Sequence, residues 1–232
     1  MATAQEVGRM IARGIAPVAQ AVSPQATGGV LRRVLEIALD GYGRFPSAKT
    51  TAARHLQRHS GSESAAIQSL IDVHVRLASA QGFVTNLGGM VALPVAVPAN
   101  LTGVAVLQVR MVGAIAHLRG YDLDDSRVRT ALVMCLLGGE GIGSRVAQGI
   151  LPTSPMAVAT APMFDPDLDR RVAEEVVADL VTRIGGKNVA LMITKRVPLL
   201  GGGIGAVIDG IATHQIGTST KGELVRRRRL LA

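Results

Sequence analysis

Apolar residues along this chain recur mostly three or four positions apart, and runs with strict strand-like alternation hardly occur. This spacing predicts helices over 30–39, from Ser60 to Gly82, from Leu101 to Arg119, from Asp122 to Leu137, and from Asp165 onward. A short amphipathic helix is also expected over 7–18, where ordinary packing and docking on a membrane surface both remain open. The sequence therefore predicts an all-α, multi-helix bundle.

Glycine, proline and capping residues place the predicted helix ends. Ser60–Glu63 fits a capping box, and Asp165–Asp169 combines an N-cap, a proline at the first helical position and an acidic first turn. Glycines are expected to end helices at Gly82, Gly120 and Gly185-Gly186, with a further helix over 188–196. The proline-rich segment 149–166 is expected to be a loop.

The segment 82–108 carries no formal charge and is long enough to span a bilayer, for which about 20 apolar residues suffice. Pro94 and Pro98 interrupt it, so we expect two shorter apolar pieces around an extended hinge at Leu93–Pro98. Asn100 is then expected to cap the following helix. A re-entrant hairpin, an interfacial wedge and a buried core hairpin all fit this pattern.

A second uncharged stretch follows Pro198 and is rich in glycine. Small residues recur at intervals of four, which is typical of a helix face that packs closely against another helix: Gly201 and Gly205, and Gly202, Ala206 and Gly210. The same run formally matches a dinucleotide-binding fingerprint, but no strand precedes it, so nucleotide binding is not expected.

Composition supports a charge-poor, apolar protein. Hydrophobic residues make up 48% and charged residues 18%, against about 25% charged in average soluble domains. The formal net charge is +8, and the chain ends in a basic tail, Arg226–Arg229, that is either solvated or in contact with anionic lipid. Aromatic residues are only 2%, and no basic face with interleaved aromatics is visible, so nucleic-acid binding is not expected.

Residues with catalytic or metal-binding chemistry do not form a recognisable set. His55 and His59 have the spacing of a metal pair, but no third ligand is evident, and a solvated basic face is expected there. His74 lies on an apolar helix face and is expected to be a satisfied core histidine. The single cysteine, Cys135, excludes an internal disulfide, indicates core packing and favours an intracellular protein. No catalytic, cofactor-binding or metal-binding residue is predicted.

Three charges lie within apolar stretches: Glu140, Arg145 and Asp209. If these stretches enter lipid, the charges should be paired or face a cavity. If the protein is soluble, they are helix-end or surface residues. The sequence leaves both interpretations open.

Four segments in order resemble conserved blocks of the EcsC protein family, in a form like its actinobacterial members: Leu93–Asn100, Leu107–Ala116 with Arg110, Gly120–Asp122, and Arg196–Asp209. The resemblance implies a mainly helical bacterial protein associated with the cytoplasmic membrane, in a family with members encoded beside ABC-type transporter components. Asn100 stands where the family commonly has Asp, and Asn caps a helix equally well, which favours a structural role at that position.

The leading hypothesis is a non-enzymatic, membrane-associated helical accessory protein on the cytoplasmic side, without a cofactor, linked to an ABC-type transporter or to membrane homeostasis. The alternative is a soluble helical module for protein interaction or self-association. Its expected parts are an N-terminal helical extension (1–59), an EcsC-like helical domain (60–222) and a basic tail (223–232). Candidate lipid- or helix-contacting residues are Leu93, Pro94, Pro98, Asn100, Arg110, Gly201, Gly202, Gly205, Ala206 and Gly210.

Overall fold

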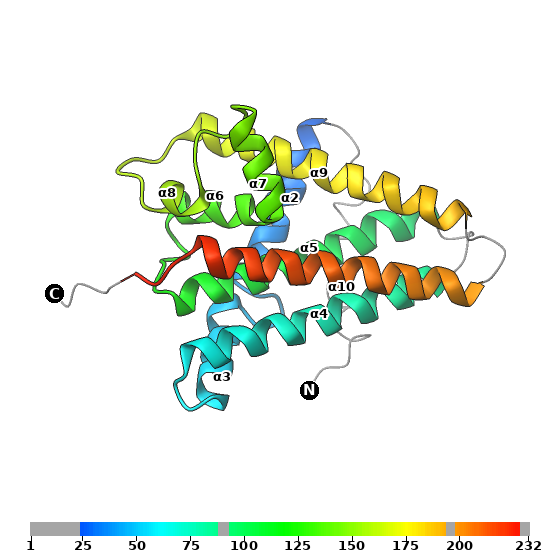
Figure 1. The fold of residues 1–232 in the computed structure, drawn as a ribbon, viewed down its shortest axis with the longest axis horizontal. Coiled ribbons are helices and arrows are strands. Elements are labelled where there is room, and N and C mark those ends of the chain that lie inside the picture. The colour runs from blue at the N-terminus through cyan, green and yellow to red at the C-terminus, as the bar shows by residue number, and fades with distance from the viewer. Residues whose placement is uncertain (1–23, 88–92, 194–197, 228–232) are drawn as a thin grey trace.

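The computed structural model describes residues 24–87, 93–193 and 198–227, and within them the chain forms helices and no β-strand (Figure 1). The prediction of an all-α, multi-helix bundle is confirmed. The helix predicted over 7–18 lies outside the described residues. The described helices are α2 (Pro24–Leu39), α3 (Ala48–Arg58), α4 (Glu63–Leu87), α5 (Leu93–Leu118), α6 (Ser126–Cys135), α7 (Gly138–Ala147), α8 (Pro155–Ala159), α9 (Pro166–Ile193) and α10 (Pro198–Glu223).

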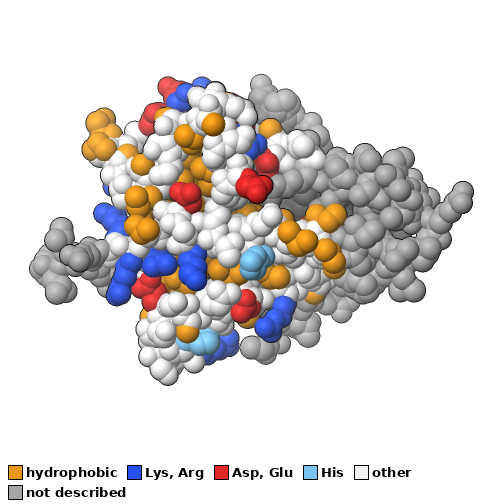
Figure 2. Space-filling model, viewed as in Figure 1, with side chains coloured by type: hydrophobic (Ala, Val, Ile, Leu, Met, Phe, Trp, Pro, Cys, Tyr) orange, Lys and Arg blue, Asp and Glu red, His pale blue; other side chains and the backbone are white. Residues whose placement is uncertain are grey.

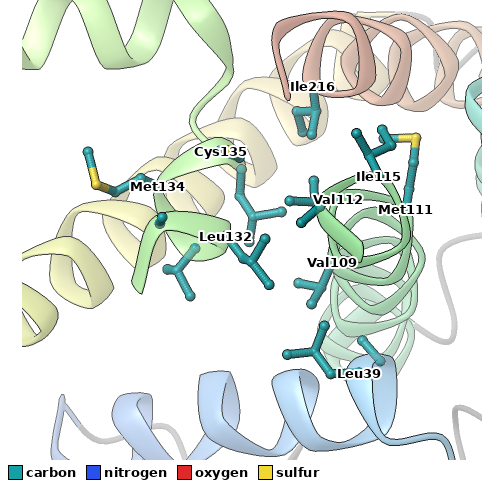
Figure 3. Close-up of a cluster of buried hydrophobic side chains, with 14 of the residues drawn as sticks. Leu39, Val109, Met111, Val112, Ile115, Leu132, Met134, Cys135 and Ile216 are labelled. Carbon is teal, nitrogen blue, oxygen red and sulfur yellow. The ribbon is translucent and has the colours of Figure 1, made fainter. Parts of the chain in front are cut away.

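Helix α5 is the centre of the molecule. Every residue from 103 to 116 is buried, and α2, α3, α4, α6, α9 and α10 all pack against this helix. Side chains from four helices meet in the apolar core shown in Figure 3, where α5 contributes Val109, Val112 and Ile115. Leu39 of α2, Leu132 and Cys135 of α6, and Ile216 of α10 complete this part of the core.

Helix α10 lies along α4 in the most extensive helix–helix contact of the described residues (Figure 1). Glycines allow the close approach. A Cβ at Gly210 would lie 2.4 Å from Ser79 Oγ, and one at Gly217 would lie 2.9 Å from Ile71 Cγ1 and 3.1 Å from Met111 Sδ. The predicted close-packing face therefore exists at Gly210 and continues to Gly217.

Two helix ends follow the predicted local chemistry. Asp165 caps α9, accepting backbone N–H groups with its side chain, whereas the helix expected from Asp122 begins at Ser126, after Asp125, whose side chain accepts the N–H of Arg127. Gly120 follows α5 with φ +86°, and the N–H groups of Gly120 and Tyr121 donate to the carbonyls of His117 and Ala116. That pair of bonds is a Schellman motif, which needs a residue with positive φ at the position of Gly120.

The expected hinge at Leu93–Pro98 is wrong, because α5 begins at Leu93 and runs through both prolines and Asn100. Pro94 lies in the first turn, where its missing N–H has no partner in any helix. Pro98 lies in the helix interior, where a proline removes one backbone hydrogen bond and clashes with the carbonyl four residues earlier, yet the helix continues beyond it. Asn100 is consequently an interior residue of the helix and not its N-cap.

Three other predicted helix ends are also wrong. Helix α4 passes through Gly82 to Leu87, and α9 passes through Gly185-Gly186 to Ile193, absorbing the separate helix expected over 188–196. A glycine inside a helix costs about 1 kcal/mol relative to alanine, which tertiary packing readily exceeds. Helix α4 begins at Glu63 after Ser62, whose Oγ accepts the N–H of Ala65, instead of after Ser60.

The segment 149–166 is mostly loop, as predicted, except for the single-turn helix α8, which is capped by Ser154. Over the described residues, none of the helices combines the length and the apolar character needed to cross a bilayer.

Replacing Gly217 by leucine tests the α4–α10 contact. The new side chain would overlap Ile71 and Met111, so we expect the free energy of unfolding to fall by about 1–3 kcal/mol. Gly222→Leu is the matched control, because no atom lies within 4 Å of a Cβ there, and its effect should stay within about 0.5 kcal/mol. Equal urea-unfolding midpoints for the two variants would contradict this close contact.

Candidate functional site

The residues singled out from the sequence do not form one site. Leu93, Pro94, Pro98 and Asn100 occupy the start of α5, and their side chains lie outside the described residues, as do Gly201, Gly202 and Gly205. Ala206 is partly buried on α10. Gly210 and Arg110 both contact α4, at Ser79 and His74 respectively.

Arg110 is the most unusual of these residues, because its side chain is charged and yet only 5% exposed. Its Nε donates to His74 Nε2 at 3.2 Å, and its guanidinium lies over the Phe45 ring, 4.1 Å from the ring centroid. Burial lowers the pKa of Arg110 to about 10, which leaves it cationic at neutral pH. A cation–π contact and one hydrogen bond therefore hold a positive charge inside the bundle.

His74 is a satisfied core histidine, as predicted. It is 1% exposed, and its Nδ1 lies 2.8 Å from the carbonyl oxygen of Leu70. Because Nε2 accepts from Arg110, the ring proton must reside on Nδ1 and be donated to Leu70. Burial, and then the charge of Arg110, lower the pKa of His74 to about 3, so the ring is neutral at physiological pH.

A small cavity of about 100 Å³ opens beside Arg110, between α3, α4 and α5. We call it the Arg110 pocket, and its basic lining consists of Arg54, His55, Arg58, His74 and Arg110. His55 is buried, with Nδ1 3.1 Å from Ser69 Oγ, and burial followed by the charge of Arg58 lowers its pKa. The expectation that the whole α3 basic face is solvated is therefore wrong for His55, while Arg54 and Arg58 are exposed.

Among the described residues, no carboxylate lines the Arg110 pocket. In the part of the chain that the structure describes, none of Arg54, Arg58 and Arg110 forms an ion pair with an acidic side chain. The described residues likewise hold no cluster of potential metal ligands, and His59 is the C-cap of α3. The pocket is therefore a concentration of positive charge.

A larger cavity of about 740 Å³ lies between α5, α7, α9 and α10. Its walls are mainly aliphatic, and Gln108, Asp209 and Ser219 are among its polar lining residues. Gln108 is buried and donates from Nε2 to Thr213 Oγ1 at 3.1 Å. This volume is typical of sites for small organic ligands, which measure about 300–1,000 Å³.

The three charges left open by the sequence have different surroundings. Arg145 of α7 pairs with Glu175 at 2.8 Å and with Asp179 at 3.4 Å, both on α9. Glu140 is exposed in the first turn of α7. Asp209 is only 2% exposed and lines the larger cavity, so the interpretation as a surface residue is wrong for this position.

Basic residues also gather where α5 and α10 end. We call Arg119, Arg226 and Arg227 the basic end. Arg119 and Arg226 both pair with Glu63, at 3.1 and 3.2 Å, and Arg227 lies over the Tyr121 ring. Figure 2 shows Lys and Arg side chains at this end of the face, beside the last turn of α10.

Sequence reasoning missed the Arg110 pocket because its parts are far apart in the chain. Phe45 lies in the loop before α3, Arg54 and Arg58 lie on α3, and His74 and Arg110 lie on two further helices. One signal was present: Arg54 and Arg58 are four residues apart and share a helix face with no acidic neighbour on α3. Only the packing of α3 on α5 brings this face to Arg110.

The neutral state of His74 predicts a pH dependence of stability. The unfolded chain binds a proton at His74 below about pH 6.5, whereas the folded chain does so only near pH 3, so this stability is present above pH 6.5 and is lost as pH falls toward 3. Between pH 7.5 and pH 5 we expect His74 alone to lower the free energy of unfolding by about 2 kcal/mol.

The measurement is urea unfolding of the native chain and of His74→Gln at both pH values. Glutamine can accept the hydrogen bond from Arg110 but does not titrate. The free energy of unfolding of His74→Gln should therefore fall by about 2 kcal/mol less than that of the native chain between pH 7.5 and pH 5. Equal losses for the two proteins, or a charged His74 ring in the ¹⁵N NMR spectrum at pH 5, would contradict a neutral core histidine.

Comparisons with known proteins give no identity for the chain. No protein-family model, no curated protein and no solved structure matches it. The likeness to the EcsC family accordingly stays a prediction from four sequence blocks, and the function has to be argued from the sites described above.

Proposed function

We propose that this protein is a non-enzymatic accessory protein that binds the cytoplasmic face of the bacterial membrane peripherally, through anionic phospholipid at its basic end. The observation that carries the proposal is that the arginine-rich C-terminal segment leaves the bundle at a fixed place. The N–H of Arg227 donates to the carbonyl of Arg119 at 2.9 Å, and Tyr121 Oη donates to the carbonyl of Val225 at 3.1 Å.

This anchoring gives the tail a defined position on the surface. A Cβ at Gly120 would lie 3.5 Å from the carbonyl oxygen of Arg227, an ordinary van der Waals distance, so the backbone at Arg227 lies against the turn after α5. The sequence continues with Arg228, Arg229 and two leucines. Arg119, Arg226 and Arg227 therefore form one basic group, with Glu63 as the acidic partner of Arg119 and Arg226.

The charge of this group supports contact with an anionic membrane surface. A basic residue near an anionic membrane surface contributes about 1 kcal/mol, so several arginines in one place give appreciable binding at low ionic strength. The net charge of +8 adds long-range attraction to a negative surface. The two leucines after Arg229 supply apolar groups of the kind that enter the headgroup region.

The buried titratable groups support a non-enzymatic role. Cys135 is fully buried, and burial raises the pKa of its thiol to about 12, so it does not supply a thiolate at neutral pH. His74 is held neutral, with both ring nitrogens engaged by Leu70 and Arg110. Neither group is set up for nucleophilic or acid–base chemistry.

A protein-interaction module is the second candidate, favoured by an exposed apolar pair on α10. Val207 is 59% exposed and Ile211 is 55% exposed, one helical turn apart. The glycine face expected to mediate self-association is a different surface, because Gly210 and Gly217 are occupied by α4 of the same chain. A partner would therefore bind at Val207 and Ile211 and not at these glycines.

Removing two charges from the basic end tests the proposal. We expect Arg226→Gln/Arg227→Gln to weaken binding to vesicles of phosphatidylcholine and phosphatidylglycerol by about 2 kcal/mol, or roughly 30-fold, because each arginine contributes about 1 kcal/mol. Vesicle co-sedimentation of the full chain at low salt measures this.

The matched control is Arg170→Gln/Arg171→Gln, which removes two exposed charges from α9. It should retain nearly all of the binding. No co-sedimentation of the native chain, or equal losses for the two double variants, would overturn the proposed docking through the basic end.

A further inference from the structure

The Arg110 pocket contains a buried charge without a counter-charge. A guanidinium removed from water requires an opposite charge or a full set of hydrogen-bond acceptors, and leaving it without them costs several kcal/mol. Within the described residues Arg110 makes one hydrogen bond, from Nε to His74, and Nη1 and Nη2 are not among the buried atoms that lack a partner, because they reach the open pocket. The Phe45 ring covers one face of the guanidinium but cannot accept the in-plane N–H groups.

The surroundings of Arg110 increase this imbalance. Arg54 and Arg58 reach the same pocket from α3 and are not neutralised by any carboxylate of the described residues. Three guanidinium groups thus face one cavity. Acidic side chains elsewhere in the bundle pair with other arginines, as Glu63 does with Arg119 and Glu175 does with Arg145.

The size of the pocket limits what can neutralise it. A water molecule takes about 30 Å³ in the liquid, so about 100 Å³ holds roughly three waters or a small ion with a few oxygens. Sites for drug-sized ligands measure about 300–1,000 Å³. A tetrahedral oxyanion or the headgroup phosphate of a lipid fits these limits, whereas a nucleotide does not.

Guanidinium chemistry indicates which anion is suited. The planar fork of an arginine binds the oxygens of a phosphate or carboxylate through two parallel hydrogen bonds. Three such groups around one cavity favour an anion with more than one charge and with oxygens pointing in several directions. We propose that the Arg110 pocket binds a phosphate-type oxyanion, with Arg110 at its base and Arg54 and Arg58 at its mouth.

In this proposal His74 and Phe45 are positioning residues. His74 accepts the hydrogen bond from Nε and Phe45 stacks on the guanidinium, so the edge that carries Nη1 and Nη2 is left for the anion. Leu70 orients His74 in turn, through its carbonyl oxygen 2.8 Å from Nδ1. The proposal does not depend on the membrane function, because it uses different residues from the basic end.

The test is thermal unfolding of the full chain in phosphate against chloride at equal ionic strength. At ten times the dissociation constant, binding should raise Tm by roughly 3–6 °C for a chain of this size. Phosphate also stabilises proteins generally, by exclusion from their surface. Variants are therefore needed to separate binding from that effect.

Arg54→Gln/Arg58→Gln removes the two exposed arginines at the mouth and should leave Tm in chloride nearly unchanged, because surface substitutions have small effects. The phosphate-dependent rise should fall to a small fraction of the native value. Arg170→Gln/Arg171→Gln, with the same change in charge on α9, should keep the full rise. Arg110→Met should show no phosphate-dependent rise in Tm. Circular dichroism checks that this variant folds.

An equal phosphate-dependent rise in Tm in the native chain and in Arg54→Gln/Arg58→Gln would overturn the proposal, as would the absence of a rise in the native chain.

A second experiment identifies the source of the phosphate, with vesicles that contain phosphatidic acid. If Arg54→Gln/Arg58→Gln weakens vesicle binding more than the α9 control does, the pocket takes a lipid headgroup. If only the effect of free phosphate is lost, the pocket takes the soluble anion.

Discussion

Every residue of helix α5 between 103 and 116 is buried, so the polar side chains on that stretch depend on partners inside the protein or on the cavities that they line. Two long polar side chains, Gln108 and Arg110, lie there. Gln108 donates to Thr213 of α10, and Arg110 donates to His74 of α4 and stacks on Phe45. These contacts fix how α4 and α10 are positioned around α5, because a rotation of either helix would leave a buried amide or guanidinium without its partner.

The same constraint accounts for the unusual chemistry of the molecule. A neutral acceptor at His74 and an aromatic ring hold Arg110 in place, but they do not cancel its charge. The Arg110 pocket and the basic end are therefore separate concentrations of positive charge, one internal and small, the other on the surface at the ends of α5 and α10.

The glycines of α10 serve the interior of the bundle. Gly210 and Gly217 let α10 approach α4 so closely that Ser79 and Ile71 occupy the space a side chain would need. This packing compensates for the low helix propensity of glycine. Helix α5 continues through Pro98 and α4 continues through Gly82, two places where local preference alone would end or break a helix.

Local sequence determined the helical class, the caps at Asp125 and Asp165, the turn at Gly120 and the burial of His74, because each depends on residues within one or two turns of helix. The lengths of α5 and α9 did not follow from local sequence, because α5 continues through Pro98 and α9 continues through Gly185-Gly186, residues that favour a break or an end of a helix. The Arg110 pocket was decided by tertiary packing, which brings α3 and α4 against α5. Arg54 and Arg110 are separated by a whole helical hairpin in sequence, and no local pattern reports that two cations will share one cavity without an acid between them.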